Sequence, residues 1–350
     1  FRDWSPLEGH SITCLQFSPS GDRFGLATPA ARFQVYDREG KKLVTTIKGD
    51  QYLADMAHTK GHVAAVTGLA WHPTAPDFII SASEDGTMRF WNLNGRKIFD
   101  ELLCGDIIKV KNSRGLKACV TCMLLTPDGR ALIAGVDDGS LQMFNLRAPG
   151  AKYIRPDVHI AAAHAPGSRI VSLSCDAAGT RLVSRSDDGV VKLWDARKPG
   201  KTPLATVQGA DNHALVTNAV FSPDARLLLV PTARMPGPHA SSGAAVGRVL
   251  VFRVPDLEAA CQSAAAVGSS SAVDAAAAPF AISLPPGVTP TVVVWHAVIN
   301  QVAVGCSDGA TRILFDPVLS KKGAILSSGR APKAREAIDE VLQGKVGRII

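Results

Sequence analysis

The chain has 350 residues, of which 46% are hydrophobic and 20% charged, and its formal net charge is +7 at pH 7. This apolar content is enough for a large core in one domain, but no apolar run approaches the roughly 20 residues that a membrane-spanning helix needs. The seven cysteines lack the spacing of a disulfide framework, which indicates reduced thiols in the cytoplasm or nucleus.

A pattern of short strands and turns recurs along the chain. The first unit places Gly9-His10 before a turn at Phe17–Gly21 and an apolar run at Phe33–Asp37. The clearest unit is the fourth, in which alternating apolar runs flank Asp188-Gly189 and predict a β-hairpin that ends in Trp194-Asp195. Units spaced by roughly 45–55 residues are typical of repeat architectures. We expect them near residues 9–47, 61–103, 116–155, 164–207, 213–256 and 288–328.

The segments that interrupt this pattern are also informative. A long connector occupies residues 48–60. The first unit has Thr28–Ala31 where others have Asp-Gly, and the fifth carries an insertion from about Arg234 to Gly247, so both hairpins should be irregular. Residues 258–287 are rich in alanine and serine. They are expected to form an inter-blade linker, flexible or partly helical, and a holder for a partner peptide is the alternative.

These motifs resemble the WD-repeat β-propeller, and the resemblance covers nearly the whole chain. It implies an all-β fold of four-stranded antiparallel blades that stack around an axis. It also implies that a Gly-His histidine, a strand serine, a turn aspartate and the closing tryptophan of a unit form one hydrogen-bonded chain. Structural rather than catalytic roles are therefore expected for His62, Ser81, Asp85 and Trp91 in the second unit, and for His164, Ser184, Asp188 and Trp194 in the fourth.

The number of units is one fewer than in most WD propellers. The sequence begins at Phe1 rather than at a methionine, and Phe1–Ser5 has the character of the end of an earlier segment. We therefore expect six blades in this chain and seven in the full protein, with the first blade upstream. The propeller should occupy residues 1–328, and a basic tail should follow at 329–350.

Three segments narrow the resemblance. The connector Lys48–His62, together with Tyr36–Gly40 and Asp316–Ala324, is similar to the eukaryotic gastrulation-defective-like WD-repeat family. This resemblance implies a nuclear protein in which a seven-bladed propeller lies between a polar N-terminal extension and a basic C-terminal tail. It also implies links to ubiquitin-ligase adaptors, to chromatin and DNA repair, and to RNA processing.

Signatures of catalysis are missing from the sequence. It has no phosphate-binding glycine-rich loop with lysine, no dinucleotide fingerprint, no nucleophile elbow and no paired zinc-ligand helix. Cys119 and Cys122 have CxxC spacing, but an offset of three along a strand places the sulfurs on opposite faces. We therefore expect a binding platform that is not an enzyme and that uses no cofactor or metal.

The charge is concentrated at the C-terminal end. Ser320–Ile350 contains seven Lys or Arg and three acidic residues, so this segment carries +4 of the net charge. Within it, Pro332–Gln343 predicts a short helix with Ile338 and Leu342 on its apolar face. The segment is either a solvated arm or a docking element for RNA or an acidic protein face. The contacting cations would be Lys321, Lys322, Arg330, Lys333 and Arg335.

One run has a more specific resemblance. Leu182–Arg197 is similar to the box by which WD-repeat substrate receptors dock on the adaptor of cullin-type ubiquitin ligases, although Arg185 departs from the small residue that the box wants. Arg197 is the residue that distinguishes this box from an ordinary blade sequence, because its planar guanidinium would pair bidentately with a partner acid. Asp195 and Lys198 flank it. A solvated arginine is the alternative interpretation.

These observations together predict a non-catalytic nuclear scaffold that docks proteins within a large assembly, specifically a spliceosomal or pre-mRNA-processing ribonucleoprotein. The alternative is a substrate receptor of a cullin-type E3 ubiquitin ligase in chromatin regulation or DNA repair. The expected partners are proteins of a nuclear complex, with RNA or a cullin-ligase adaptor as further candidates. Neither a membrane nor a small-molecule substrate is expected.

Overall fold

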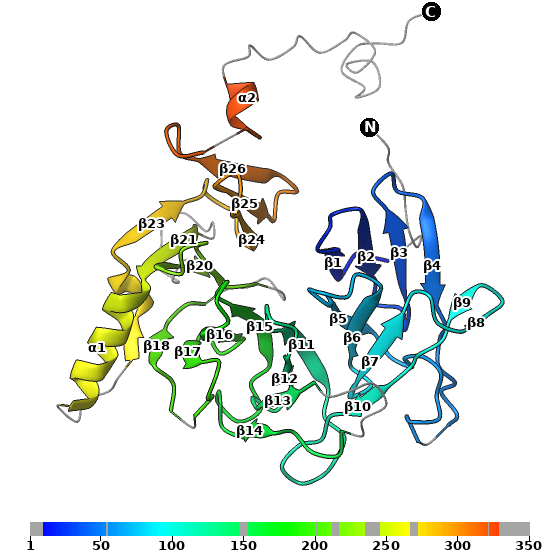
Figure 1. Ribbon diagram of the computed structural model, residues 1–350. Helices are drawn as coiled ribbons and strands as arrows, with labels where there is room; N and C mark the ends of the chain where they lie inside the picture. Colours follow the sequence, from blue (N-terminus) through cyan, green and yellow to red (C-terminus); the bar gives the residue numbers. More distant parts are fainter. Residues whose placement is uncertain are drawn as a thin grey trace, which may run out of the picture.

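Strands dominate the computed structural model of this chain, which describes residues 10–53, 55–146, 153–200, 202–211, 217–234, 246–266, 272–320 and 322–328. The strands form six sheets that follow one another around a common axis, as the blades of a propeller do (Figure 1). The expected all-β, WD-type blade architecture is therefore confirmed. Within the described ranges, no helix has the length and apolar character needed to cross a membrane.

The first sheet combines strands of the first unit with a hairpin from the second. Its order is β1 (Cys14–Phe17), β2 (Arg23–Ala27), β3 (Phe33–Asp37), β4 (Lys42–Thr46), β9 (Glu101–Leu102) and β8 (Lys97–Ile98). Strands β1 to β4 pair antiparallel, whereas β9 pairs with β4 in parallel. The β8–β9 hairpin thus adds two strands to the outer edge of its neighbouring blade.

The second, third and fourth sheets each begin with an inner strand and continue outward. The second is β5 (Val66–Trp71), β6 (Phe78–Ser83), β7 (Thr87–Asn92) and β10 (Ile107–Lys109). The third is β11 (Val120–Leu125), β12 (Ala131–Val136), β13 (Leu141–Asn145) and β14 (Val158–Ile160). The fourth is β15 (Ile170–Cys175), β16 (Arg181–Ser186), β17 (Val191–Asp195), β18 (Ala205–Gln208) and β22 (Ala272–Asp274).

The fifth and sixth sheets complete the arc, and a helix is inserted in the chain after the third strand of the fifth sheet. The fifth sheet is β19 (Val220–Phe221), β20 (Leu227–Arg234), β21 (Val246–Arg253) and β23 (Phe280–Ser283). The sixth is β24 (Pro290–His296), β25 (Gln301–Cys306) and β26 (Thr311–Phe315). The helices are α1 (Val254–Ala266), the 3-10 turn η1 (Ala275–Ala277) and α2 (Ile325–Ser328).

Asp-Gly turns close several of these hairpins. In the second sheet, Gly86 joins β6 to β7 with a φ of +70°, and a Cβ atom at this position would lie 2.8 Å from the carbonyl oxygen of Ala118. A residue with a side chain would therefore meet both backbone strain and a steric clash. This requirement explains why the Asp-Gly pair marks the repeat in the sequence.

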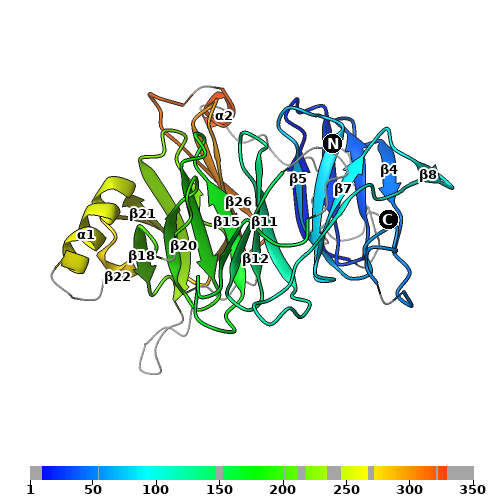
Figure 2. The ribbon, with the colours of Figure 1, turned by 60° about the horizontal axis from the view of Figure 1, so that its bottom comes forward.

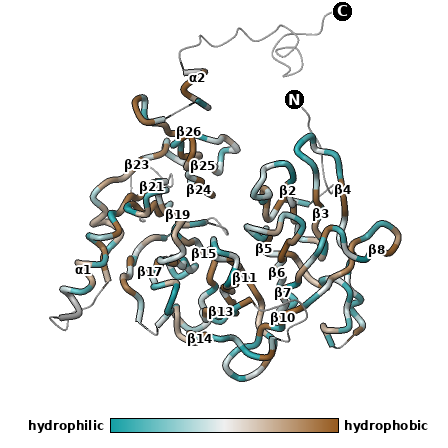
Figure 3. Tube along the Cα trace, in the orientation of Figure 1, coloured by the Kyte–Doolittle hydropathy of each residue, from teal (hydrophilic) through white to brown (hydrophobic). Residues whose placement is uncertain are grey.

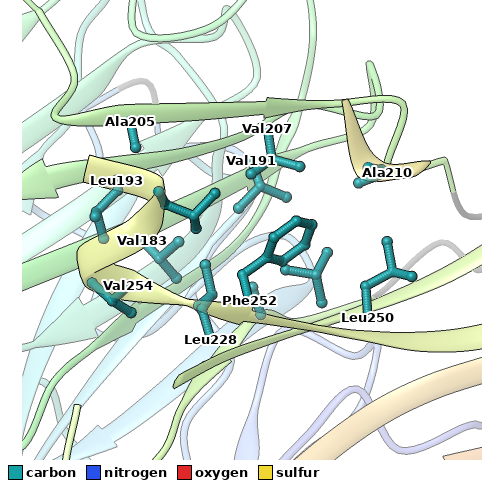
Figure 4. Close-up of a cluster of buried hydrophobic side chains, with 14 of the residues drawn as sticks. Val183, Val191, Leu193, Ala205, Val207, Ala210, Leu228, Leu250, Phe252 and Val254 are labelled. Carbon is teal, nitrogen blue, oxygen red and sulfur yellow. The ribbon is translucent and has the colours of Figure 1, made fainter. Parts of the chain in front are cut away.

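The core lies between neighbouring sheets rather than inside any one of them. Val183 and Leu193 of the fourth sheet pack against Leu228 and Phe252 of the fifth (Figure 4). Similar clusters join the first sheet to the second, the second to the third, the third to the fourth, and the fifth to the sixth. Neighbouring sheets therefore bury the faces that they turn toward one another by stacking, as expected for a repeat that cannot fold alone.

The segment 258–287 was expected to be an inter-blade linker, flexible or partly helical. A helix is present, but the segment leads from β21 to β23 of the same sheet rather than from one blade to the next. Its first part belongs to α1, which buries Val254, Leu257 and Cys261 at helical spacing. Strand β22 then pairs in parallel with β18, and β23 becomes the outer strand of the fifth sheet. Figure 2 shows α1 at the rim beside β18, β21 and β22. The alanine-rich composition concealed this structure, because a few apolar positions suffice to anchor it.

The ring of described residues is open between the sixth sheet and the first (Figure 1). The sixth sheet has three described strands where four were expected. Apolar side chains face outward on both sides of this opening: Phe17 is 58% exposed on β1, and Val294 and Ile313 are exposed on β24 and β26. A seventh blade in the full protein stays a prediction.

Candidate functional site

Four buried side chains of the second sheet are joined by hydrogen bonds. Trp91 donates its indole N–H to the hydroxyl of Ser81 over 2.8 Å, and that hydroxyl lies 2.7 Å from Nε2 of His62. Nδ1 of His62 lies 2.9 Å from a carboxylate oxygen of Asp85. These distances fit a histidine that donates to Asp85 from Nδ1 and accepts from Ser81 at Nε2.

The protonation states of this group follow from burial. Burial lowers the pKa of His62, against the hydrogen bond and charge of Asp85. Burial alone would raise the pKa of Asp85, but the hydrogen bond and charge of His62 outweigh it, with a hydrogen bond from Thr87, and hold the pKa at about 2. The hydrogen bonds of His62 to Asp85 and Ser81 therefore tie β6 and β7 to the chain entering β5.

The fourth sheet brings three of its four corresponding residues together. Trp194 donates to the hydroxyl of Ser184 over 2.9 Å, and this hydroxyl lies 2.7 Å from Nε2 of His164. Asp188 is not in hydrogen-bond range, because Nδ1 of His164 lies 3.9 Å from its nearest oxygen and has no hydrogen-bond partner. The sequence pattern is the same in both sheets, but the hydrogen bond between histidine and aspartate is present only in the second.

The environments of the two aspartates explain this difference. Asp85 is fully buried and accepts a hydrogen bond from the Thr87 hydroxyl. Val190 stands at the position of Thr87 in the fourth sheet and offers no hydroxyl, and the Asp188 side chain is 20% exposed. Burial lowers the pKa of His164 to about 4, although the Asp188 charge acts in the opposite direction.

Two buried or half-buried cations were missed by the sequence reasoning. Each lies two residues before the closing tryptophan of its sheet and donates to backbone carbonyls of the preceding loop. Arg89 donates to the carbonyls of Thr59 over 2.8 Å and Met56 over 3.0 Å, and Lys192 donates to that of Ala163 over 2.6 Å. The shared position two residues before tryptophan is the sequence signal that could have identified both cations. Their contacts fix the loops that lead into β5 and β15.

Arg185 was noted only as a departure from the adaptor-docking box. The structure places it in the interface between the fourth and fifth sheets, where it is buried. Its guanidinium donates to the carbonyls of Pro231 over 2.6 Å and Ala210 over 2.8 Å. Burial lowers its pKa to about 10 while the Asp211 charge opposes that shift. Arginine, rather than the small residue that the docking box has at this position, thus connects the fourth and fifth sheets.

Arg197 lies just beyond the end of β17 and its side chain is 70% exposed. Its Nε lies 3.6 Å from a carboxylate oxygen of Asp195, and its backbone N–H donates to the same oxygen over 2.9 Å. Lys198 is exposed beside it. The guanidinium is therefore accessible and is held only loosely by its own turn.

The basic tail lies mostly outside the described residues. Lys322 is exposed, and its backbone carbonyl accepts a hydrogen bond from the Gln301 side chain over 2.8 Å. The other tail positions fall outside the described ranges, namely Lys321, Arg330, Lys333, Arg335, Ile338 and Leu342. Their docking roles stay predictions.

The cysteine pair has the properties of packed side chains. Burial raises the pKa of Cys122 to about 12, and burial followed by the nearby Asp137 raises that of Cys119. Both thiols are therefore protonated near neutral pH, which disfavours thiolate chemistry. Across the described part of the chain, no group of three or more His, Cys, Asp or Glu residues is arranged to hold a metal ion.

A family model described as "WD domain, G-beta repeat" matches residues 4–28, 55–92, 110–145 and 157–195. These matches cover parts of the first four sheets. The fifth and sixth sheets continue the same arrangement around the axis without a match to that model.

Similar proteins come from distant animals and from a fungus. WD repeat-containing protein 70 of Xenopus tropicalis is 30% identical over 338 residues, which are 96% of this chain and 49% of the relative. Gastrulation defective protein 1 homolog of Drosophila melanogaster is 30% identical over 341 residues, covering 97% and 47%. An uncharacterized WD repeat-containing protein of Schizosaccharomyces pombe is 28% identical over 309 residues, covering 88% and 49%. The chain thus spans about half the length of these relatives.

Proposed function

Since this chain belongs to the WD-repeat proteins, within a gastrulation-defective-like family, we propose that it is a non-catalytic nuclear scaffold that docks proteins in a pre-mRNA-processing ribonucleoprotein. WD-repeat proteins are in general scaffolds for protein interaction, and this coarser role follows from the family. The nuclear location, the splicing assembly and the contact with RNA belong to the proposal.

The observation that carries the proposal is how the polar core residues are used. His62, Ser81 and Asp85 form hydrogen bonds with one another, and His164 bonds to Ser184 within its own sheet. These groups stabilise blades, so the loops and the outer edges of the ring provide the contact surface. The basic segment after the last sheet supports an anionic partner.

The experiment is purification of the tagged chain from nuclear extract, with and without ribonuclease, followed by quantitative mass spectrometry. The proposal expects pre-mRNA-processing proteins as the main recovered set. A variant in which five basic residues are neutralised together should recover less of these proteins, and the recovery should depend less on salt. These residues are Lys321, Lys322, Arg330, Lys333 and Arg335. Recovery of cytoplasmic or membrane complexes in their place would refute the nuclear proposal.

A second candidate is a substrate receptor of a cullin-type ubiquitin ligase in chromatin regulation or DNA repair. It is favoured by the exposed guanidinium of Arg197, two positions after Asp195 of the Trp194-Asp195 pair. Arg197→Ala should abolish co-purification of the ligase adaptor and leave the fold intact, whereas the neighbouring Lys198→Ala serves as the matched control. Equal adaptor recovery by parent and Arg197→Ala, or none by the parent, would exclude this role for the arginine.

A further inference from the structure

The most exposed of the large apolar side chains in the described ranges is Phe99, at 97%. It stands at the tip of the β8–β9 hairpin, which projects from the rim of the ring (Figures 1 and 2). Figure 3 shows hydrophobic colour on this hairpin. A phenylalanine in this position contributes no burial to the core.

The backbone at the tip is also unfavourable for the residues it holds. Phe99 and Asp100 have φ values of +49° and +64°, which place both in the left-handed region. A two-residue hairpin of this kind favours Asn-Gly, and a bulky aromatic residue with positive φ is an outlier. Neither the turn nor solvation therefore favours phenylalanine here, and such strain is typical of functional positions.

The base of the hairpin is firmly held. Leu102 is fully buried between the first two sheets, and its carbonyl accepts a hydrogen bond from the N–H of Ile47 over 3.0 Å. Arg32 pairs with Glu101 over 2.9 Å. The aromatic side chain is thus presented on a rigid support, which reduces the entropy lost on binding.

The surroundings of the tip define the partner. Because β4 and β9 are parallel, with Thr45 opposite Glu101, the tip lies toward the start of β4. Leu43 is exposed there, and so are three lysines close to the hairpin or to the start of β4. These lysines are Lys41, Lys42 and Lys97, and they outnumber the exposed acids Glu39 and Asp100, while Glu101 is paired with Arg32. An apolar knob with this excess of lysines is complementary to an apolar pocket with an acidic rim.

We propose that the β8–β9 hairpin is a docking knob, in which Phe99 inserts into an apolar, acid-rimmed pocket of a protein partner. The inference rests on the proposed scaffold function and names a surface through which it acts. Single-stranded nucleic acid is disfavoured, because bases stack on successive aromatic side chains along a groove, whereas this tip is convex and carries one ring beside Asp100.

The first test separates binding from folding. The double substitution Phe99→Asn with Asp100→Gly supplies the residues that the turn favours, so it should raise the Tm by about 1–3 °C and weaken partner association at least tenfold. Phe99→Leu should retain most of the association. A fall in Tm of similar size in the Asn-Gly variant would show that Phe99 serves the fold, and the inference would be overturned.

The second test identifies the partner surface. The photo-crosslinking amino acid p-benzoylphenylalanine replaces Phe99 in the full chain, and the control carries it at the exposed Ile154 of another blade. In nuclear extract, residue 99 should crosslink to one protein that the control does not capture, within a peptide that combines apolar and acidic residues. An RNA adduct, a second copy of this chain, or a pattern equal to the control would contradict the inference.

The two proposals fail in distinguishable ways. If the parent chain recovers nuclear assemblies and the Asn-Gly variant recovers them equally well, the scaffold stands and the knob is wrong. If the parent recovers none, the scaffold proposal itself fails.

Discussion

Nδ1 of His164 lies 3.9 Å from the nearest carboxylate oxygen of Asp188 and has no hydrogen-bond partner. The same pair in the second sheet, His62 and Asp85, is in contact at 2.9 Å. Two blades with the same sequence motif thus differ in how tightly the turn aspartate is bound. This contrast makes a prediction about stability, because removal of a buried, hydrogen-bonded carboxylate costs more than removal of a partly exposed one.

Asp85→Ala should reduce the free energy of unfolding by about 2–4 kcal/mol, because it removes the acceptor at 2.9 Å from the buried Nδ1 of His62 and the acceptor of the Val63 and Thr87 N–H groups. Asp188→Ala should cost about 1 kcal/mol or less, since it removes mainly the hydrogen bond to the N–H of Val190. Urea unfolding monitored by tryptophan fluorescence compares the two variants. Equal losses would show that the aspartates are equivalent.

The histidines predict a pH dependence. Folded His164 has a pKa of about 4 against an ordinary 6.5, so the unfolded chain binds more protons between these values. Stability therefore rises with pH across that window and is unaffected by this group above it, with a slope of at most about 1.4 kcal/mol per pH unit for one histidine. His164→Gln should reduce the slope between pH 4 and 6.5. An unchanged slope in the variant would contradict the buried, neutral assignment.

Removal of two arginines of the same run should affect stability to different degrees. Arg185→Ala removes hydrogen bonds to the carbonyls of Pro231 and Ala210 and opens a cavity between two sheets, so it should cost about 2–4 kcal/mol of stability. Arg197→Ala should change stability by about 0.5 kcal/mol or less, because its side chain is exposed. Parallel thermal melts measure both, and a large loss for Arg197→Ala would place that residue in the fold.

The exposed apolar face of the sixth sheet, among the described residues, predicts solution behaviour. Val294 and Ile313 are exposed on the outward face of the sixth sheet, so changing both to lysine should lower binding of a hydrophobic dye and reduce self-association of the 350-residue chain. The matched control is Val304→Lys, which places a charge in the buried interface with the fifth sheet and should unfold the protein. Undiminished dye binding in the double variant would show that this face is covered.

The repeat was predictable because its signals are local. Each Asp-Gly turn demands a backbone that few residues adopt, and each closing aromatic residue occupies a fixed offset, so sequence spacing carries the blade pattern directly. The insertion between Val254 and Ser283 was not predictable in the same way. Its helix is anchored by a few apolar side chains. Strand β22 pairs with β18, where Ala272 lies opposite Thr206, a residue far away in the sequence.

The site was accessible to sequence reasoning only in part. The motif located His164 and Asp188, but their separation depends on Val190, whose missing hydroxyl acts through the three-dimensional neighbourhood. Arg185 appeared to be a mismatch in a docking box, because nothing local reveals carbonyls supplied by another sheet. Phe99 gave no signal either, since an apolar residue in a strand-rich sequence is ordinarily assigned to the core.

The most direct test of the scaffold proposal is sedimentation of the tagged 36.8 kDa chain in nuclear extract, followed across a density gradient before and after ribonuclease treatment. The proposal predicts that the chain migrates with a large ribonucleoprotein, together with pre-mRNA-processing proteins, and that ribonuclease shifts it to a smaller, protein-bound form. Migration as a free monomer under both conditions would contradict it.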